Sequence, residues 1–301
     1  MAVPQLFRCP GYEAVTRDRL GPELVKNAVI LGSGPAAPSV GSQLADDTIV
    51  IALNNAHRAS SRVDFSLYAD DLPPAQRHPH TAVIGRSSPH YSPALQHFGG
   101  ILHCGSTMAF NAGYWALLNL PFSQISYFAC DLHYPQGRSH FYGLGRPDPL
   151  RRDVSLQSLP ALALRLFFFG LQHQVLFLNA SAEPETRLCL PRVTTGLSLR
   201  RRLLEGRRAL IEDWLERLRP QAEAALALEA AAPFDARRHD YWVYDDDDRV
   251  WNHGRAVAER WLALAAQVDR IGAELAERFA ALANAADEPP LNPPADVASC
   301  P

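Results

Sequence analysis

The sequence predicts an α/β fold, in which a Rossmann-like, mostly parallel sheet with helices on both faces is followed by a C-terminal α-helical hairpin. Short apolar segments alternate with helix-like segments from residue 28 to residue 191, which is the pattern of a parallel sheet between helical layers. The first apolar segment, AVIL at residues 28–31, runs directly into the loop Gly32-Ser33-Gly34-Pro35. After residue 191 the chain changes to long segments rich in Arg, Glu, Leu and Ala, which predict helices.

The chain of 301 residues is expected to divide into four parts. A polar lead-in covers residues 1–27, and a Rossmann-like nucleotide-binding domain covers residues 28–191. A helical region follows over residues 192–288, with helices expected at 197–231 and 252–286 from heptad-like apolar spacing and i,i+4 charge pairs. This hairpin either packs on the domain or projects and mediates self-association into a homo-oligomer. The proline-rich tail at residues 289–301 is expected to be disordered.

Composition excludes several classes of protein. A net charge of -3 gives no general basis for binding nucleic acid or an anionic membrane surface. No segment approaches the roughly 20 consecutive apolar residues of a membrane span. The five cysteines are widely spaced and form no CxxC pair, which argues against a disulfide framework and against a zinc site. We therefore expect a cytoplasmic protein that does not bind nucleic acid and does not span a membrane.

Strands are expected at residues 28–31, 48–53, 64–68, 81–84, 124–130 and 174–178, where short apolar or β-branched segments end in polar residues. Helices are expected at residues 106–120 and 155–170, and a loop without regular structure at residues 85–100. In parallel sheets, ligands bind outside the carboxyl ends of the strands. The polar residues at those ends would face one crevice, and they are Ser33, Asn54, Asp70, Asp131 and Asn179.

The loop from Gly32 to Pro35 predicts an anion site, because such loops leave backbone N–H groups free to meet a phosphate. The pattern GxGxxG is not completed, however, and Asn54-Asn55 stands where a ribose-binding acid would end the second strand. No GxxxxGK[ST] motif is present either. The loop is therefore a weak NAD or FAD signal and is not an ordinary P-loop.

Asn54 and Asn55 allow two interpretations. They could close a hairpin turn, although the residues that follow look like the start of a helix. Alternatively, their amide groups offer a donor and an acceptor without charge, which suits a nucleobase or a sugar hydroxyl.

The segment from Asp131 to Tyr142 concentrates groups that could carry out chemistry. It holds His133, Tyr134 and His140, and it reads either as a surface loop with packed aromatics or as a general acid/base with phenolic hydroxyls near a leaving phosphate. Arg138 and Arg146 could add positive charge there. Histidine–carboxylate spacing in this segment could also bind a metal, but the segment contains no HxH or HExxH pattern that would support a metal site.

The chain has, in this order, a strand that runs into GxGP, a strand that ends in Asn, a Ser/Thr-rich helix start, and a strand that leads to DxxY and Ser-His-Phe-Tyr. This order of motifs resembles the bacterial CMP-sialic-acid-dependent sialyltransferases of lipooligosaccharide synthesis. The arrangement is also similar to the wider clan of MptE-like 6-hydroxymethylpterin diphosphokinases, which includes uncharacterised bacterial and phage proteins. The resemblance covers roughly residues 28–191. The family's Asn-Gly-Pro-Ser loop reads Ser33-Gly34-Pro35-Ala36 in this chain.

The resemblance implies roles for particular residues. Ser33 and Gly34 would contact the nucleotide phosphate, and Asn54 would face the nucleotide sugar. A Thr-Ser pair that touches the donor corresponds to Ser106 and Thr107. Tyrosines on the departing phosphate correspond to Tyr134 and Tyr142, and the catalytic base corresponds to His140, with His133 as the alternative.

The function expected on these grounds is transfer of a glycosyl group from a CMP-type nucleotide-sugar donor to a glycan or small-molecule acceptor. That reaction needs a base for the acceptor hydroxyl and stabilisation of a leaving phosphate, and it requires no further cofactor. One alternative is an MptE-like diphosphokinase that uses ATP and magnesium, with Asp70, Asp71 and Asp131 as metal ligands. The other is a non-catalytic Rossmann-like assembly protein that acts through its helical hairpin.

Overall fold

The structure is a computed structural model, and it describes residues 26–78, 82–85, 91–134, 139–143, 151–193 and 206–287. The predicted tail at residues 289–301 lies outside this part, as does all but the end of the predicted lead-in at residues 1–27. Arg138 and Arg146, which were expected to add charge near a phosphate, also lie outside the described residues.

A parallel β-sheet forms the centre of the fold. Its strands are β1 (Lys26–Leu31), β2 (Ile49–Leu53), β3 (Phe65–Tyr68), β4 (Ala82–Gly85), β5 (Phe122–Phe128) and β6 (Leu176–Asn179). Five of them run in the order β3-β2-β1-β5-β6, and β4 pairs with the outer edge of β3. All these pairs are parallel, so the predicted Rossmann-like α/β class is confirmed. The order reverses between β1 and β5, which makes their junction the switch point of the sheet.

The two faces of the sheet bury different cores. Ala28 and Ile30 of β1 belong to the larger core, and the alternating Val29 and Leu31 belong to the smaller one. This alternation follows from the two-residue side-chain period of a strand, and burial on both faces explains why β1 and β2 read as continuous apolar segments.

Helices cover the larger core, and they are α2 (Tyr91–His97), α3 (Ile101–Cys104), α4 (Met108–Asn119) and α5 (Leu159–Gln172). The opposite face is covered by two 3₁₀-helices, η1 (Ala37–Gln43) and η2 (Asn54–Ala59). The expectation of a loop throughout residues 85–100 was wrong, because α2 lies within it. Ala94, Leu95 and Phe98 are buried there. A helix of two turns is too short to show a clear period, and packing on the core stabilises it.

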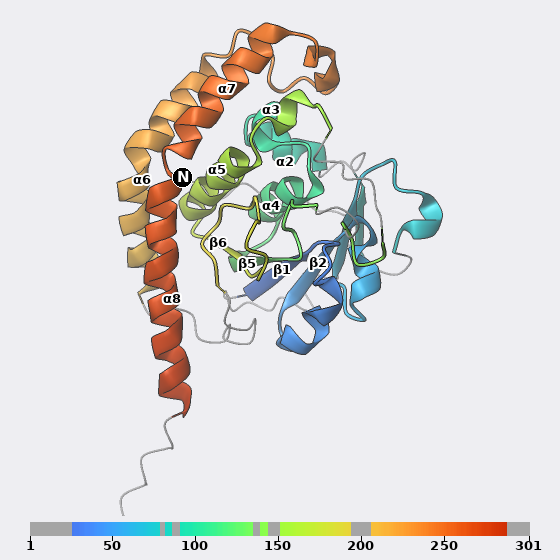
Figure 1. Ribbon diagram of the computed structural model, residues 1–301, viewed down its shortest axis with the longest axis vertical. Coiled ribbons are helices and arrows are strands. Elements are labelled where there is room, and N and C mark those ends of the chain that lie inside the picture. Colours follow the sequence, from blue (N-terminus) through green and yellow to red (C-terminus); the bar gives the residue numbers. More distant parts are fainter. Residues whose placement is uncertain are drawn as a thin grey trace, which may run out of the picture.

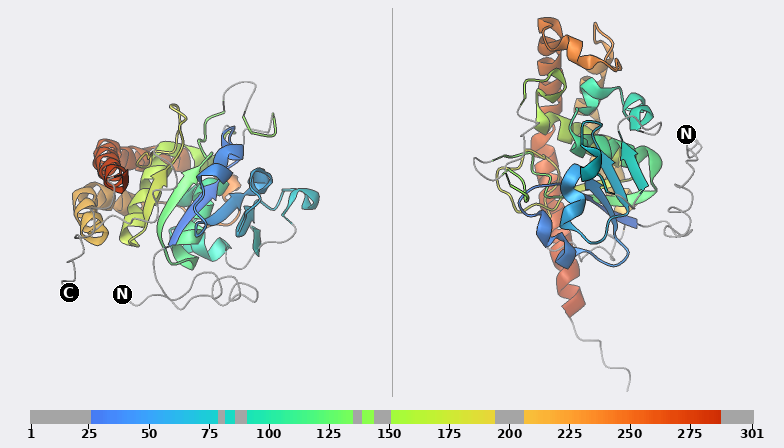
Figure 2. Two further views of the ribbon diagram at one scale, coloured as in Figure 1. Left: turned by 90° about the horizontal axis from the view of Figure 1, so that it is seen from below. Right: turned by 90° about the vertical axis from the view of Figure 1, so that its right-hand side faces the viewer.

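The C-terminal region consists of α6 (Arg207–Ala230), α7 (Asp248–Leu262) and α8 (Ala265–Asp287). The predicted second helix of the hairpin is therefore bent into α7 and α8. Figures 1 and 2 show the three helices together on the α5 side of the sheet, with α8 continuing past the α/β part. Both α6 and α7 contact α5. Among the described residues, no helix is long and apolar enough to cross a membrane.

A buried ion pair joins the two parts of the molecule. Arg165 on α5 donates from Nε to Glu229 Oε1 at 2.8 Å and from Nη2 to Glu229 Oε2 at 2.9 Å, and Glu229 belongs to α6. Trp261 on α7 also donates to Glu229, at 2.7 Å. The remaining Arg165 donors meet the Tyr114 hydroxyl on α4 and the Phe98 carbonyl after α2. One guanidinium therefore links α5 to α6, to α4 and to the segment that follows α2.

Gly32 allows the loop after β1 to lie directly against the end of β5. A Cβ at this position would lie 2.2 Å from the Ala129 carbonyl oxygen and 2.6 Å from the Cys130 sulfur. Neither contact is possible for a real side chain, and one of them involves the backbone, which has little room to move. The glycine at the start of the loop is therefore required by packing.

We predict that Gly32→Ala lowers the free energy of unfolding by about 3 kcal/mol or more, because the added methyl group forces the ends of β1 and β5 apart. Urea denaturation measures this change. Gly41→Ala is the matched control, since no described atom lies within 4 Å of the Cβ position at Gly41. The control variant should stay within about 1 kcal/mol of wild type. Equal stability of the two variants would contradict the packing role of Gly32.

We predict that Glu229→Gln lowers the free energy of unfolding by about 3–5 kcal/mol, because it leaves the Arg165 charge buried without its counter-charge. Glu212→Gln serves as the control, since Glu212 pairs with Arg208 at 2.9 Å on the exposed surface of α6. The control should cost less than about 1 kcal/mol. A loss at Glu229 no larger than that at Glu212 would show that the buried pair does not hold the helical region in place.

Candidate functional site

The candidate site lies at the carboxyl ends of β1 and β5, where loops from separate parts of the chain meet. The Phe141 N–H donates to the Ser33 carbonyl at 3.0 Å, which joins the segment 139–143 to the loop after β1. The Arg187 N–H donates to the Asp131 carbonyl at 2.9 Å, which joins the loop after β6 to the end of β5. The predicted site residues Ser33, Asp131 and His140 thus belong to loops that are bonded to one another or to the same strand ends.

The two glycines of the first loop do not present a phosphate cradle. The Gly32 N–H donates to the Phe128 carbonyl at 2.8 Å, and the Gly34 N–H donates to the Ala129 carbonyl at 2.9 Å. Both donors extend the ladder between β1 and β5. The expectation that these N–H groups are free to meet an anion was therefore wrong, because the two strand ends pack more closely than the sequence pattern indicates.

A stack of flat side chains lies beside this loop. The His140 ring stacks on the Tyr142 ring at 5.1 Å with an interplanar angle of 22°, and the Tyr134 ring lies on it at 5.7 Å with a tilt of 39°. Arg58 Cζ lies 5.9 Å from the centre of the Tyr142 ring. Three predicted catalytic residues are thus brought together. Arg58 was missed, because it lies on η2 and only the tertiary fold carries it to the loop.

Burial controls the protonation of His140. The ring is partly buried, and desolvation lowers its pKa below the usual 6.5. Nδ1 lies 3.0 Å from the Ser139 hydroxyl oxygen. The imidazole is therefore neutral at neutral pH, which is the form that accepts a proton.

The other histidine of this region has a different partner. His133 Nε2 lies 3.3 Å from Glu185 Oε2, in the loop that follows β6. The two candidates for the general base therefore have different surroundings. His133 pairs with a carboxylate, whereas the His140 ring contacts the rings of Tyr134 and Tyr142.

Asp131 is a buried carboxyl group at the switch point. Its side chain is 8% exposed, and within the described parts of the chain its Oδ1 has no hydrogen-bond partner. Burial raises the pKa of Asp131, although a hydrogen bond from Ser181 opposes the shift. A Cβ at Gly34 would lie 3.2 Å from Asp131 Oδ2, so the carboxyl group lies directly against the first loop.

Three of the four non-glycine residues with positive φ in the described structure lie at the same edge of the sheet, and the fourth, Gln174, precedes β6 at the opposite edge. Asn54, Ala129 and Leu132 have φ angles of 47°, 54° and 52°, in the left-handed region. Asn54 begins η2 directly after β2, and the other two follow β5. Each such residue costs about 1–3 kcal/mol, and strain of this kind gathers at functional sites. It supports the assignment of the site to this edge.

Asn54 and Asn55 begin η2 and do not close a hairpin. Asn54 Oδ1 accepts the Ala69 N–H at 3.0 Å, and the Asn54 carbonyl accepts from His57 Nδ1 at 2.9 Å. The Asn55 amide donates to Gln76 Oε1 at 3.1 Å. Both side chains therefore have structural partners, and the contact of Asn54 with a nucleotide stays a prediction.

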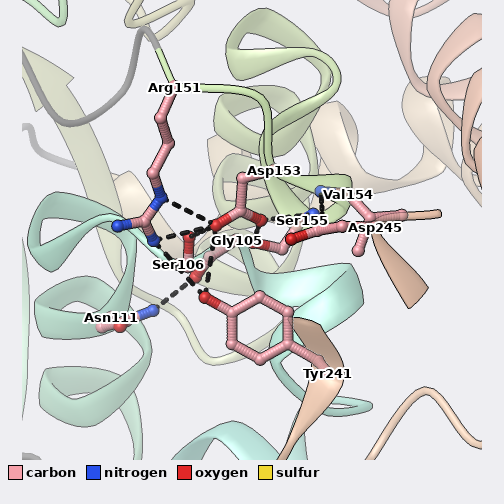
Figure 3. Close-up of polar contacts among 9 residues, drawn as sticks. All are labelled: Gly105, Ser106, Asn111, Arg151, Asp153, Val154, Ser155, Tyr241 and Asp245. Carbon is pink, nitrogen blue, oxygen red and sulfur yellow. Dashed lines mark hydrogen bonds and ion pairs between the residues drawn. The ribbon is translucent and has the colours of Figure 1, made fainter. Parts of the chain in front are cut away.

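Ser106 belongs to a second polar cluster, which surrounds Asp153 (Figure 3), and Thr107 follows it at the start of α4. The Ser106 hydroxyl donates to Asp153 Oδ2 at 3.3 Å, and Thr107 Oγ1 accepts the Phe110 N–H as the N-cap of α4. Arg151 and Tyr241 also donate to Asp153 Oδ2, at 2.8 Å and 3.3 Å. This cluster joins the start of α4 to the helical region, and contact of Ser106 and Thr107 with a donor remains a prediction.

Metal ligands are not gathered in the described structure. Across residues 26–78, 82–85, 91–134, 139–143, 151–193 and 206–287, no three His, Cys, Asp or Glu side chains form a group that could hold a metal ion. Asp70, Asp71 and Asp131 are thus not brought together as a metal site. Asn179, the last predicted strand-end residue, accepts the Ser181 N–H at 2.9 Å and so shapes the loop that faces Asp131.

No family model, no curated protein and no solved structure matches this chain. Of what the motif resemblance implies, the structure shows the parallel α/β sheet alone.

We predict a graded loss of stability at Asn54, because the residue combines a left-handed backbone with an acceptor for the Ala69 N–H. Asn54→Asp keeps both features, so its free energy of unfolding should lie within about 1 kcal/mol of the wild-type value. Asn54→Gly loses only the acceptor, whereas Asn54→Ala also places an alanine in the left-handed region at φ 47°. The alanine variant should therefore lose about 1–2 kcal/mol more of the free energy of unfolding than the glycine variant. Urea denaturation of the three variants gives this order, and equal stability of Asn54→Ala and Asn54→Gly would contradict it.

Proposed function

We propose that the protein is a nucleotide-dependent transferase, namely a glycosyltransferase that uses a CMP-type nucleotide-sugar donor with His140 as its general base. The observation that carries this proposal is the stack of Tyr134, His140 and Tyr142 beside the Ser33 loop. It holds a neutral imidazole at the switch point of a parallel sheet, which is where such folds bind nucleotides.

The chemistry that suits this arrangement is displacement at the anomeric carbon of the donor sugar. The acceptor hydroxyl oxygen forms a bond to that carbon while the bond from the carbon to the nucleotide phosphate oxygen breaks. The hydroxyl proton passes to His140, and the phosphate leaves with the electron pair. Because His140 Nδ1 lies against Ser139, Nε2 is the nitrogen that would take the proton.

Side chains would bind the phosphate in this proposal, since Gly32 and Gly34 use their N–H groups within the fold. The Arg58 guanidinium lies over Tyr142, whose ring is 39% exposed. A cation and a phenolic hydroxyl next to the base are suited to the charge that develops on a departing phosphate. Asp131 Oδ1, which has no partner among the described residues, would accept a hydrogen bond from a hydroxyl group of the sugar.

Nucleotide binding tests the proposal directly. Thermal shift with CMP, CDP, UDP and ATP, each with and without magnesium, should show stabilisation by a cytidine nucleotide that does not depend on magnesium. Arg58→Gln should weaken this shift. Stabilisation by ATP only with magnesium would favour the diphosphokinase. The absence of a shift with every nucleotide would contradict a nucleotide site and would favour the assembly protein.

We predict that His140→Asn lowers turnover of the nucleotide sugar by about 100-fold or more, because it removes the general base. Since burial lowers the pKa of His140 below 6.5, wild-type activity should persist in mild acid and fall as pH drops through that lowered pKa. His173→Asn is the matched control, because desolvation and the nearby His97 also lower the pKa of His173, which lies at the end of α5. An unchanged pH profile in His140→Asn would contradict the role.

A further inference from the structure

A small cavity lies between the α/β part and the helical region, away from the candidate site. Its volume is about 50 Å³, roughly a third of an engineered cavity of about 150 Å³ that binds benzene. The space exceeds that needed by one water molecule, which is about 10–15 Å³ on the same scale. The apolar part of its wall includes Leu102, Ala161, Leu162, Val257 and Trp261.

Two of the residues that line the cavity each have a buried polar atom without a hydrogen-bond partner in the described part of the chain. Gln157 Oε1 and His253 Nε2 are both buried, and neither has a hydrogen bond within the described structure. The Gln157 amide nitrogen donates to the Val154 carbonyl at 3.1 Å, which fixes the orientation of the amide and leaves Oε1 as an acceptor. A native protein seldom leaves two buried polar atoms unpaired at one place, so a molecule that pairs with them is implied.

The charges around the cavity cancel. Arg165 and Glu229 also line it, but they form a bidentate pair with each other. Burial lowers the pKa of His103 to about 4, and burial also lowers the pKa of His253, although Glu229 opposes the latter shift. Both histidines are therefore neutral at neutral pH. An ion in this space would lose its hydration without gaining a counter-charge, so the cavity favours an uncharged occupant.

We propose that this cavity is a binding site for a small uncharged molecule that carries a primary amide group. The amide N–H would donate to Gln157 Oε1, and the amide carbonyl would accept from the His253 Nε2–H tautomer. The apolar remainder of the molecule would contact Leu102, Ala161 and Val257. Such a ligand would join η5 (Val154–Leu156) and the start of α5 to α7, and it would stabilise the contact between the two parts of the chain.

The Gln157 side chain packs closely against Gly254, and this close packing supports a specific site. A Cβ at Gly254 on α7 would lie 2.1 Å from Gln157 Nε2. Any larger residue at this position would therefore displace the Gln157 side chain from the cavity wall. The acceptor is thus placed by a specific close approach between η5 and α7, and a ligand that uses it would be sensitive to changes on either element.

Acetamide and acetate test the proposal as a matched pair, because they have the same shape and acetate has neither the N–H donors nor neutrality. Acetamide should raise the midpoint of thermal unfolding of the full chain and shift the ring resonances of His253 and His103 in NMR spectra. Acetate at equal concentration and ionic strength should do neither. Equal responses to the two compounds, or none to acetamide, would overturn the proposal.

Variants of the full chain separate the site from general solvent effects. Gln157→Leu removes the acceptor and should abolish the acetamide response. Gln221→Leu is the matched control, because Gln221 Oε1 is another buried atom without a partner in the described residues and does not line the cavity. Should Gln157→Leu fold poorly, Ala258→Leu fills the cavity from α7 and should have the same effect. An acetamide response that survives in a folded cavity variant would contradict the site.

Discussion

The Arg165–Glu229 pair is the interaction on which the arrangement of the molecule depends. The charge and the hydrogen bonds of Arg165 lower the pKa of Glu229, although burial by itself would raise it. The pair replaces hydration that both groups lost on folding, and every element that touches it is thereby fixed relative to the others. The C-terminal helices are for this reason part of the folded core, and α5 is the element that they share with the sheet.

The same electrostatic centre determines the chemistry of its neighbours. Burial beside Arg165 and Glu229 lowers the pKa of His103 to about 4 and raises the pKa of the Cys104 thiol to about 12. A buried thiol that stays protonated is unreactive toward electrophiles and metals at neutral pH. This side of the sheet is thus specialised for stability, and the small neutral cavity beside it follows from the way the two charges satisfy each other.

Three of the four buried carboxyl groups in the described residues show where a polar atom lacks a hydrogen-bond partner. Asp153 and Glu229, at 4% and 7% exposure, have hydrogen bonds to both oxygens, whereas Asp131, at 8%, has one oxygen without a partner in the described residues. The first two hold segments together. Asp131 lies instead against Gly34 of the first loop, close in sequence to Ala129 and Leu132, which have left-handed backbone. Unsatisfied polarity and strain therefore coincide at the switch point, as expected where a fold accommodates a ligand.

The sequence by itself determined the fold class, because apolar segments such as AVIL at residues 28–31 and TIVIAL at residues 48–53 must be buried on both faces of a sheet. The resemblance of its motifs also implied that Tyr134, His140 and Tyr142 act at the same nucleotide site as Ser33. Only the tertiary structure decided that α2 forms, since two turns of helix depend on packing, and that Arg58 joins the stack. It also decided that the Gly32 and Gly34 N–H groups donate to the carbonyls at the end of β5. The two strands are far apart in sequence, and the packing of the whole sheet sets the distance between them.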